Sequence, residues 1–180
     1  SLAESIIPAA DLSEQISTAG FEASGTSNMK FGLNGALTIG TMDGANVEMH
    51  ERVGAEHMFI FGLSAQQVEA RKHAGEFSAG PDIAASHRLN DVLQAIRGGV
   101  FSPDDPGRYV GLIDGLIDYD RFLVCADFDA YWDAQARVEA HWHDSKAWWR
   151  SAVLNTARMG WFSSDRTIRE YATEIWKALD

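Results

Sequence analysis

Cysteine, basic residues and long apolar stretches are the scarce features of this 180-residue chain. A single cysteine, Cys125, excludes an internal disulfide framework and a cysteine-based metal site. Because its neighbours Leu123, Val124 and Phe128 are apolar, we expect a buried thiol, and a reducing cytoplasm is the expected compartment. No run of roughly 18 or more apolar residues is present, which argues against a membrane span. The first residues also lack the basic and apolar regions of an export signal.

Positive charge is outweighed throughout the chain. The 15 lysines and arginines face 26 acidic residues, which gives a net charge of −11. Such a surface opposes nucleic acid and anionic membranes as partners, whereas a neutral polysaccharide is compatible with it. The hydrophobic content of 46% is enough for the core of one ordinary globular domain.

The spacing of apolar residues predicts alternating helices and short strands in the first half of the chain. We expect strands at 37–41 and 58–61, a loop leading from 11 to 20, and helices at 2–10, 26–36, 45–53 and 64–73. From residue 90 onward the pattern is helical, with helices expected at 91–98, 107–118, 128–143, 145–159 and 165–179. The fold class predicted is therefore α/β, with an α/β core over 1–89, a mainly helical part over 90–180, and ligands at the loops that follow strand ends.

The stretch from Gly20 to Phe31 is the most informative part of the chain. Its small residues leave room around exposed backbone N–H groups, and Lys30 follows five positions after Gly25. Glycine allows close approach of the backbone to a ligand, and unpaired amides at a helix start donate hydrogen bonds to anions. This pattern predicts an anion-binding turn that opens a helix.

A nucleotide-binding P-loop is the first alternative for this turn. Gly20 and Gly25 have the spacing of the P-loop glycines, and Thr26 and Ser27 follow them. A P-loop requires a lysine directly after the second glycine so that its amine meets the β- and γ-phosphates. Here Thr26 holds that position, which argues against a nucleoside triphosphatase.

The turn and its surroundings instead resemble the pyridoxal-phosphate lysine segment of the α-glucan (glycogen, starch and maltodextrin) phosphorylase family. The resemblance covers the whole chain, closely up to Glu48 and more loosely beyond it. The segments that carry it are Ser1–Glu4, Ile7–Gly20, Glu22–Thr26, Asn28–Phe31, Leu33–Glu48, Phe162–Ile168, Tyr171–Ala172 and Glu174–Trp176.

This resemblance implies a fold and an activity. The chain is expected to be the C-terminal portion of a longer enzyme, within the Rossmann-like C-terminal domain of a two-domain, GT-B type glycosyltransferase that ends in a helical region. The parent enzyme is expected to be a homodimer that uses inorganic phosphate to release α-D-glucose 1-phosphate from the non-reducing end of an α-1,4-glucan. We expect the chain to be inactive alone, because the other basic groups of the family's site and its N-terminal domain lie upstream of Ser1.

The resemblance also implies roles for particular residues. Lys30 is expected to hold pyridoxal 5′-phosphate as a Schiff base, while Gly25, Thr26 and Ser27 bind the phosphate of this cofactor. Glu22, together with the backbone of Ser24 and Gly25, is expected to bind the hydroxyl groups of glucose. No metal site is expected, and no residue of this segment is assigned a certain catalytic role.

Other interpretations remain open from the residues alone. Lys30 also fits a surface lysine, Glu22 a solvated loop acid, and Ser24 and Thr26 simple helix caps. A non-catalytic phosphate- or sugar-binding module requires only the turn at Gly25, and a purely structural domain requires neither the turn nor the lysine. The enzyme interpretation alone requires an imine at Lys30.

Three further patterns have ordinary structural explanations. His141 and His143 point apart on a helix, so they indicate a helix end on the surface rather than a metal site. The tryptophans at 142, 148, 149, 161 and 176 are expected to pack in the core or between domains. The segment Asp43–Glu48 is expected to be a strand-to-helix turn, with an indirect supporting role beside the cofactor region.

Overall fold

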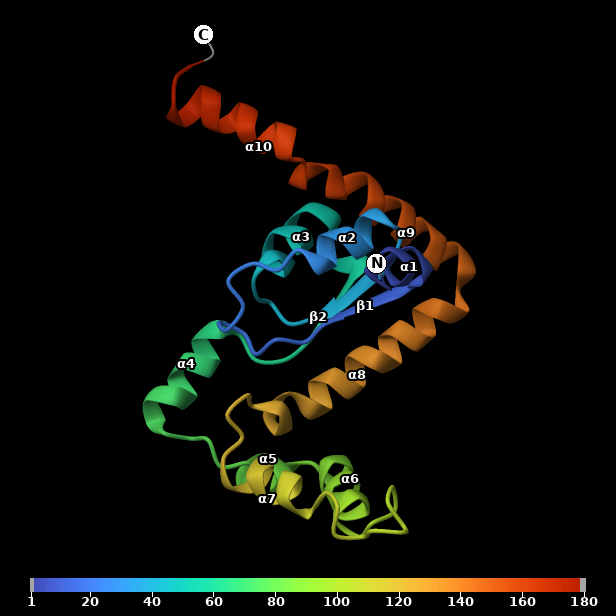
Figure 1. Ribbon diagram of the computed structural model, residues 1–180, viewed down its shortest axis with the longest axis vertical. Coiled ribbons are helices and arrows are strands. Elements are labelled where there is room, and N and C mark those ends of the chain that lie inside the picture. The colour runs from blue at the N-terminus through green and yellow to red at the C-terminus, as the bar shows by residue number, and fades with distance from the viewer. Residues whose placement is uncertain (1, 179–180) are drawn as a thin grey trace.

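A sheet of three short parallel strands lies at the centre of the computed structural model, which describes residues 2–178 (Figure 1). In spatial order the strands are β1 (Leu12–Gln15), β2 (Leu37–Gly40) and β3 (Met58–Ile60). Their last residues, Gln15, Gly40 and Ile60, are in register with one another. The loops that follow the three strands therefore leave the sheet at one common edge.

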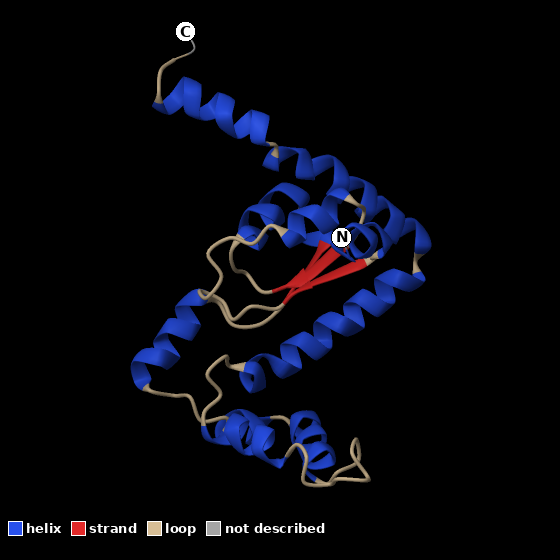
Figure 2. Cartoon of the chain, in the orientation of Figure 1, coloured by secondary structure: helices blue, strands red, loops and turns tan. Residues whose placement is uncertain are grey.

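Two helices connect the strands and cover one face of the sheet. Helix α2 (Ser27–Leu33) connects β1 to β2 along the chain, and α3 (Ala45–Val53) follows β2 and leads to β3; both helices lie above the strands in Figure 2. Apolar side chains of α3 and β3 meet a 3₁₀ helix (Met159–Phe162) in a cluster that contains Met49, Val53, Met58 and Met159. Burial of these side chains holds α3 on the sheet.

The opposite face is covered by the long helix α8 (Val124–His143), which runs beneath the sheet in Figure 1. Helix α9 (Ser145–Arg158) follows it, lies on the side of α2 and α3 in the same view, and contacts both of those helices as well as α8. Their side chains complete the main core with the sheet residues, in a cluster formed by Leu37, Ile39, Phe59, Phe61, Ala134, Val138, Trp148 and Ala152. The sheet thus lies between two helical layers, as expected for an α/β fold.

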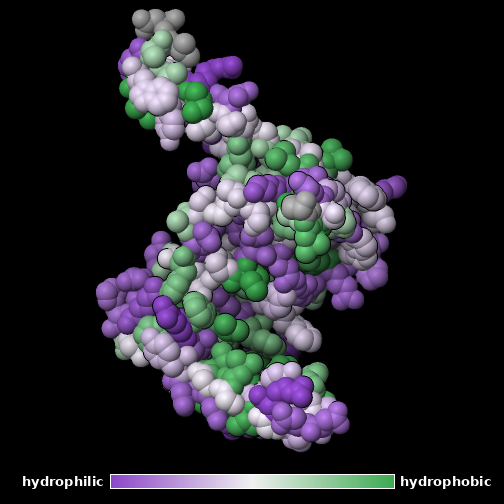
Figure 3. Space-filling view, viewed as in Figure 1, coloured by the Kyte–Doolittle hydropathy of each residue, from purple (hydrophilic) through white to green (hydrophobic). Residues whose placement is uncertain are grey.

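The remaining helices lie beside this core, form a second, smaller cluster, or, in α10 (Ser164–Glu170) and the turn after it, extend away from the core (Figure 1). They are α1 (Leu2–Ala9), a 3₁₀ helix (Ala55–His57), α4 (Ala65–Ala74), α5 (Gly80–Ala85), α6 (His87–Arg97), α7 (Val110–Asp118), α10 and a π-helical turn (Tyr171–Ile175). The smaller cluster joins α5, α6 and α7 to the start of α8 through Leu89, Leu93, Ile113 and Cys125. In the space-filling view, apolar surface gathers in this lower part of the molecule (Figure 3).

The α/β class and most of the expected elements are confirmed. The strands at 37–41 and 58–61 are present within about one residue, and α3 has the predicted bounds 45–53. Cys125 is buried as expected. Among residues 2–178, no helix is both long enough and apolar enough to cross a membrane.

Some boundaries were predicted wrongly. The loop expected at 11–20 contains β1, whose sequence Leu-Ser-Glu-Gln is too short and too polar for a strand signal. Helix α5 was not predicted, and α8 begins at Val124 instead of 128 because the Asp120 carboxylate accepts hydrogen bonds from the N–H groups of Val124 (2.9 Å) and Cys125 (2.7 Å). The last helix, expected to reach Leu179, is α-helical only to Glu170 and continues as the π-helical turn, while Leu179 lies outside the described residues.

The expectation for the tryptophans holds only in part. Trp148 is buried in the main core, and Trp161 is half-buried. Trp142, Trp149 and Trp176 are exposed, so they lie outside the core of this chain, and their packing between domains stays a prediction. Their helices present these indole rings on the outward side, where aromatic surface is available for contacts with other parts of a larger protein.

Candidate functional site

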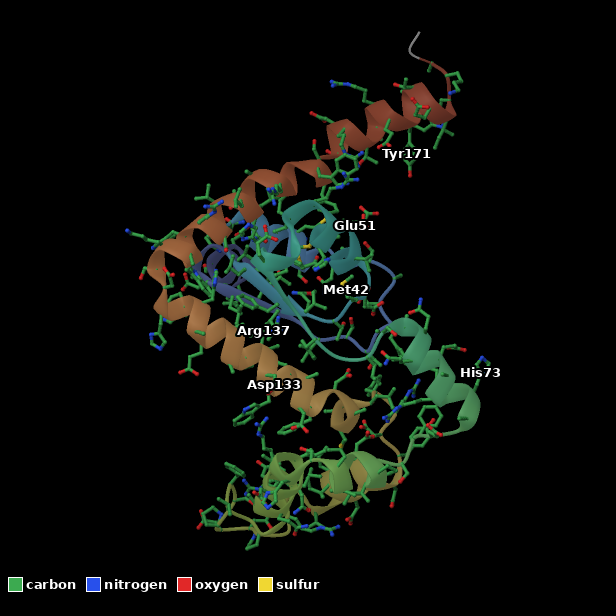
Figure 4. All side chains as sticks on the ribbon, turned by 180° about the vertical axis from the view of Figure 1, so that it is seen from behind. Met42, Glu51, His73, Asp133, Arg137 and Tyr171 are labelled. Carbon is green, nitrogen blue, oxygen red and sulfur yellow. The ribbon has the colours of Figure 1, made fainter. Side chains whose placement is uncertain are left out.

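The candidate site lies where the loops after β1 and β2 meet at the common edge of the sheet. Figure 4 labels Met42, which belongs to the turn between β2 and α3 at this edge. The loops enclose a cavity of about 220 Å³, lined by Glu14, Gln15, Ile16, Ser17, Glu22, Ser24, Gly25, Ser27, Asn28, Asp43 and Asn46. The carboxyl edge of a parallel sheet is the usual place for ligands in this class of fold.

Four of the predicted site residues come together in this cavity. Glu22, Ser24, Gly25 and Ser27 all contribute to its lining, whereas Thr26 and Lys30 do not. Glu22 is exposed, and its Oε1 accepts a hydrogen bond of 3.3 Å from the backbone N–H of Ser24. Its second carboxylate oxygen has no partner among the described residues.

The backbone from Gly25 into α2 presents unpaired donors. Gly25 has φ +83°, a conformation that favours glycine. Among residues 2–178, the N–H groups of Gly25, Thr26, Ser27 and Asn28 have no hydrogen-bond acceptor. Thr26 occupies the N-cap position of α2, but its hydroxyl makes no capping bond. This segment therefore has the donors that a phosphate group requires.

Lys30 lies one turn into α2 and is exposed. Its backbone N–H donates to the Thr26 carbonyl (3.2 Å), and its carbonyl accepts from Asn34 Nδ2 (2.8 Å). The amine makes no ion pair with any residue in the described part of the chain. The exposed side chain thus lies close in sequence to the unpaired N–H groups at the start of α2, and it does not line the described cavity.

Asp43 was expected to lie in a turn with an indirect supporting role, and its carboxylate organises the loop that carries Glu22. The side chain is buried, with 8% exposure. Its Oδ1 accepts from the N–H of Gly20 (2.9 Å), and its Oδ2 accepts from the N–H of Glu22 (2.8 Å) and from Ser17 Oγ (3.1 Å). An aspartate just beyond a buried strand was the available sequence signal for this role.

The next residue, Gly44, allows the two loops to approach closely. It has φ +50°, and a Cβ atom placed there would lie 2.3 Å from the Ser24 carbonyl oxygen. The same carbonyl accepts a hydrogen bond of 2.7 Å from the N–H of Ala45. A side chain at position 44 would therefore push the loop away from the turn.

A second set of contacts links this turn to α2. Asn46 donates from Nδ2 to the Thr41 carbonyl (2.9 Å) and accepts at Oδ1 from Asn28 Nδ2 (2.9 Å). Asn28 in turn accepts at Oδ1 from the N–H of Met29 (2.9 Å). Both asparagines are buried, so their amide groups are satisfied by each other and by the backbone.

A separate hydrogen-bonded network outside these loops joins His57, His141 and Ser151. Ser151 Oγ is 2.9 Å from His57 Nδ1 and 3.0 Å from His141 Nε2. Burial lowers the pKa of His57. The prediction that both histidines lie on the surface at a helix end is therefore wrong for His141, whose ring is half-buried and hydrogen-bonded. It is confirmed for His143, which is exposed. Within residues 2–178, no group of three or more His, Cys, Asp or Glu side chains could hold a metal ion.

Comparisons with known proteins give a consistent result. A family model described as "Carbohydrate phosphorylase" matches residues 1–178. The chain is 54% identical over 178 residues to "Glycogen phosphorylase, brain form" of Bos taurus, with 99% of the chain and 21% of the relative covered. It is 53% identical over 171 residues to a glycogen phosphorylase of Synechocystis sp. (95% and 20% covered). It is 52% identical over 177 residues to that of Pasteurella multocida (98% and 22% covered). The chain thus spans about a fifth of the length of the curated relatives it matches.

Proposed function

The chain belongs to the carbohydrate phosphorylase family, and we propose that it forms the C-terminal part of the cofactor- and glucose-binding domain of an α-glucan phosphorylase. The parallel sheet between helical layers supports the assignment to the Rossmann-like half of a two-domain, GT-B type enzyme. In this proposal residues 1–89 are the α/β core, since all strands of the described part lie there, and residues 90–180 are the helical part that also covers the sheet.

The proposed activity of the whole enzyme is phosphorolysis. A phosphate oxygen bonds to C1 of the glucose at the non-reducing end of an α-1,4-glucan, and the bond from C1 to O4 of the next glucose breaks. The departing O4 takes up a proton from the phosphate, so the products are α-D-glucose 1-phosphate and a glucan that is one glucose shorter. The net charge of −11 is compatible with a neutral glucan and disfavours nucleic acid. We place the enzyme in the cytoplasm as a homodimer, in keeping with the lone buried cysteine and the family resemblance.

The observation that carries this proposal is the run of unpaired donors from Gly25 to Asn28 followed by the exposed Lys30. These residues fit pyridoxal 5′-phosphate, because the group needs hydrogen-bond donors for its phosphate and an amine for covalent attachment. Gly25, Thr26 and Ser27 would bind the phosphate, and Lys30 would form the covalent link. When bound, the cofactor supplies a phosphate that exchanges a proton with the substrate phosphate.

The residues of the cavity have separate tasks in this proposal. The free Glu22 oxygen accepts hydrogen bonds from glucose hydroxyls, assisted by the backbone of Ser24 and Gly25. A sugar that lacks one of these hydroxyls would leave the carboxylate unpaired and would bind more weakly. Asp43 is assigned to holding the loop, since its oxygens accept three hydrogen bonds from residues 17–22.

We also propose that the chain alone is catalytically inactive. Transition-state charge in phosphate chemistry needs several preorganised donors, including cations. No lysine or arginine is among the residues that line the described cavity. Incubation of the purified chain with maltodextrin and phosphate should give no glucose 1-phosphate above a buffer control. Measurable phosphorolysis would show that the described residues suffice.

The cofactor assignment is tested by reductive trapping. The chain is incubated with pyridoxal phosphate, reduced with borohydride and mapped by peptide mass spectrometry over its four lysines, Lys30, Lys72, Lys146 and Lys177. We expect one label per chain, at Lys30, which Lys30→Ala abolishes and Lys146→Ala leaves unchanged. Scattered or absent labelling would count against the cofactor role. Glucose binding without a label at Lys30 would favour a non-catalytic sugar-binding module.

A further inference from the structure

The turn from Thr41 to Asn46 contacts both halves of the candidate site. We propose that this turn is a two-armed positioning element, in which Asp43 fixes the loop that carries Glu22 and Asn46 independently fixes the start of the helix that carries Lys30. The inference rests on the proposed function for the roles of Glu22 and Lys30. It adds a division of labour within the turn, which neither the family match nor the cavity alone specifies.

The first arm is the carboxylate of Asp43. An ionised carboxylate only accepts hydrogen bonds, and this one receives two backbone N–H groups and one hydroxyl from residues 17–22. The bond to the N–H of Glu22 fixes the backbone from which the Glu22 side chain extends. Gly44 contributes by lacking a Cβ atom, which would lie 3.1 Å from Glu22 Cγ. Loop position and side-chain direction at Glu22 therefore depend on Asp43 and its neighbour.

The second arm is the amide of Asn46. It connects the Thr41 carbonyl to Asn28, which lies in the first turn of α2 and two residues before Lys30. Asn28 also accepts the N–H of Met29, so the orientation of this turn depends on the asparagine pair. Gly40 makes room for the amide, because a Cβ there would lie 2.6 Å from Asn46 Nδ2.

Among the described residues the two arms share no side-chain hydrogen bond, and within the turn the backbone N–H of Asn46 donates to the Asp43 carbonyl (3.1 Å). Within residues 2–178, the side-chain bonds of Asp43 go only to residues 17–22, and those of Asn46 go only to Thr41 and Asn28. A change at one arm is therefore expected to disturb one half of the site and to leave the other half in place. Asparagine and aspartate side chains have nearly the same shape. Exchanging one for the other at position 43 or 46 therefore changes the hydrogen bonds with little change in packing.

The test uses the full 180-residue chain with Asp43→Asn and Asn46→Asp. Asp43→Asn replaces one acceptor oxygen with an NH₂ group that cannot accept from an N–H, and Asn46→Asp removes the donor to Thr41. Three readouts are taken from each variant: amide hydrogen exchange by NMR, the Kd for D-glucose, and the rate at which Lys30 is labelled by pyridoxal phosphate and borohydride. Asp104→Asn is the control for charge, because this aspartate is exposed in a distant turn.

We expect a crossed pattern. Asp43→Asn should speed exchange at the N–H groups of Gly20 and Glu22 at least about tenfold, and raise the Kd for glucose by a similar factor, because bonds to a charged acceptor are lost. Labelling of Lys30 should stay within about twofold of the unchanged chain. Asn46→Asp should speed exchange at Met29 and slow labelling of Lys30 at least about threefold, while the Kd for glucose stays within about twofold.

A purely structural role would give a different result. Ile113→Val, which removes one buried methylene in the distant small cluster, provides a variant that lowers Tm without touching the turn. If both turn variants impair glucose binding and labelling together, in proportion to their loss of Tm, the proposal is overturned. If the unchanged chain does not bind glucose and is not labelled at Lys30, the proposed function fails. The hydrogen-exchange pattern then still tests whether the turn has two independent arms. Separate loss of protection at 20 and 22 or at 29 supports the two arms, and joint loss refutes them.

Discussion

Replacing Gly44 with alanine should be among the most damaging single changes near the site, although it adds only one methyl group. Gly44 has φ +50°, which costs a non-glycine residue about 1–3 kcal/mol. The new Cβ would also lie 2.3 Å from the Ser24 carbonyl oxygen and 3.0 Å from the Ser24 carbonyl carbon. Both neighbours are backbone atoms, so relief requires moving the loop, at a further cost of about 1–3 kcal/mol.

The expected loss is therefore about 2–6 kcal/mol, out of a typical total stability of about 5–15 kcal/mol. Urea denaturation followed by circular dichroism measures it. Gly75→Ala is a control in open space, since Gly75 has φ +71° and ψ 21° with nothing within 4 Å of the added Cβ, and it should show only the cost of the left-handed conformation, about 1–2 kcal/mol. Gly111→Ala, in helix α7 with open space around it, should stabilise by about 0.5–1 kcal/mol. Equal losses for Gly44→Ala and Gly75→Ala would refute the argument from close approach.

Three further outcomes are expected. Burial beside Asp120 raises the pKa of Cys125 to about 12. Iodoacetamide at pH 8 should therefore modify this thiol at least about 1000-fold more slowly in the folded chain than in the urea-unfolded chain, and equal rates would contradict burial of the thiol. Burial lowers the pKa of His57, so the unfolded state binds more protons below about pH 6.5 and stability falls as pH drops through that value. His57→Asn should flatten the dependence of Tm on pH between 7.5 and 5.5, and an unchanged slope would assign it to other groups. Ser64→Ala removes the capping box with Gln67 and should cost about 1 kcal/mol in urea denaturation, whereas the exposed Ser78→Ala should cost less.

Local sequence signals were sufficient wherever an element is determined by its own residues. Helix α3 follows Asp43-Gly44 and ends at Gly54, and β3 is a compact apolar run stopped by Gly62, so both were predicted closely. Helix α4 begins after the N-cap residue Ser64, which forms a capping box with Gln67, and a serine at this position predicts a helix start from the sequence alone. In these cases turn chemistry and apolar spacing agree.

Elements that depend on distant partners were not predictable in this way. Strand β1 has little apolar character of its own and exists because it pairs with β2. The start of α8 depends on the Asp120 carboxylate, which caps the N–H groups of Val124 and Cys125. The hydrogen bonds of the Asp43 carboxylate likewise require residues 17–22 to lie against it, although they are 21 to 26 positions away in the sequence. Resemblance to a family pointed to the loop, the lysine and a supporting role for the segment Asp43–Glu48, but not to the bonds by which the Asp43 carboxylate holds the loop.

The order in which the sheet acquires its two helical layers has a consequence during synthesis. The strands and their connecting helices α2 and α3 are complete once Ile60 has left the ribosome, whereas Ala134 and Trp148, which cover Leu37 and Ile39, come much later. At about 5–20 residues per second, the roughly seventy residues between Ile60 and Ala134 take on the order of 4–15 s. During that interval one apolar face of the sheet has no cover of its own, and a chaperone that shields Leu37, Ile39 and Phe59 should raise the yield of folded chain.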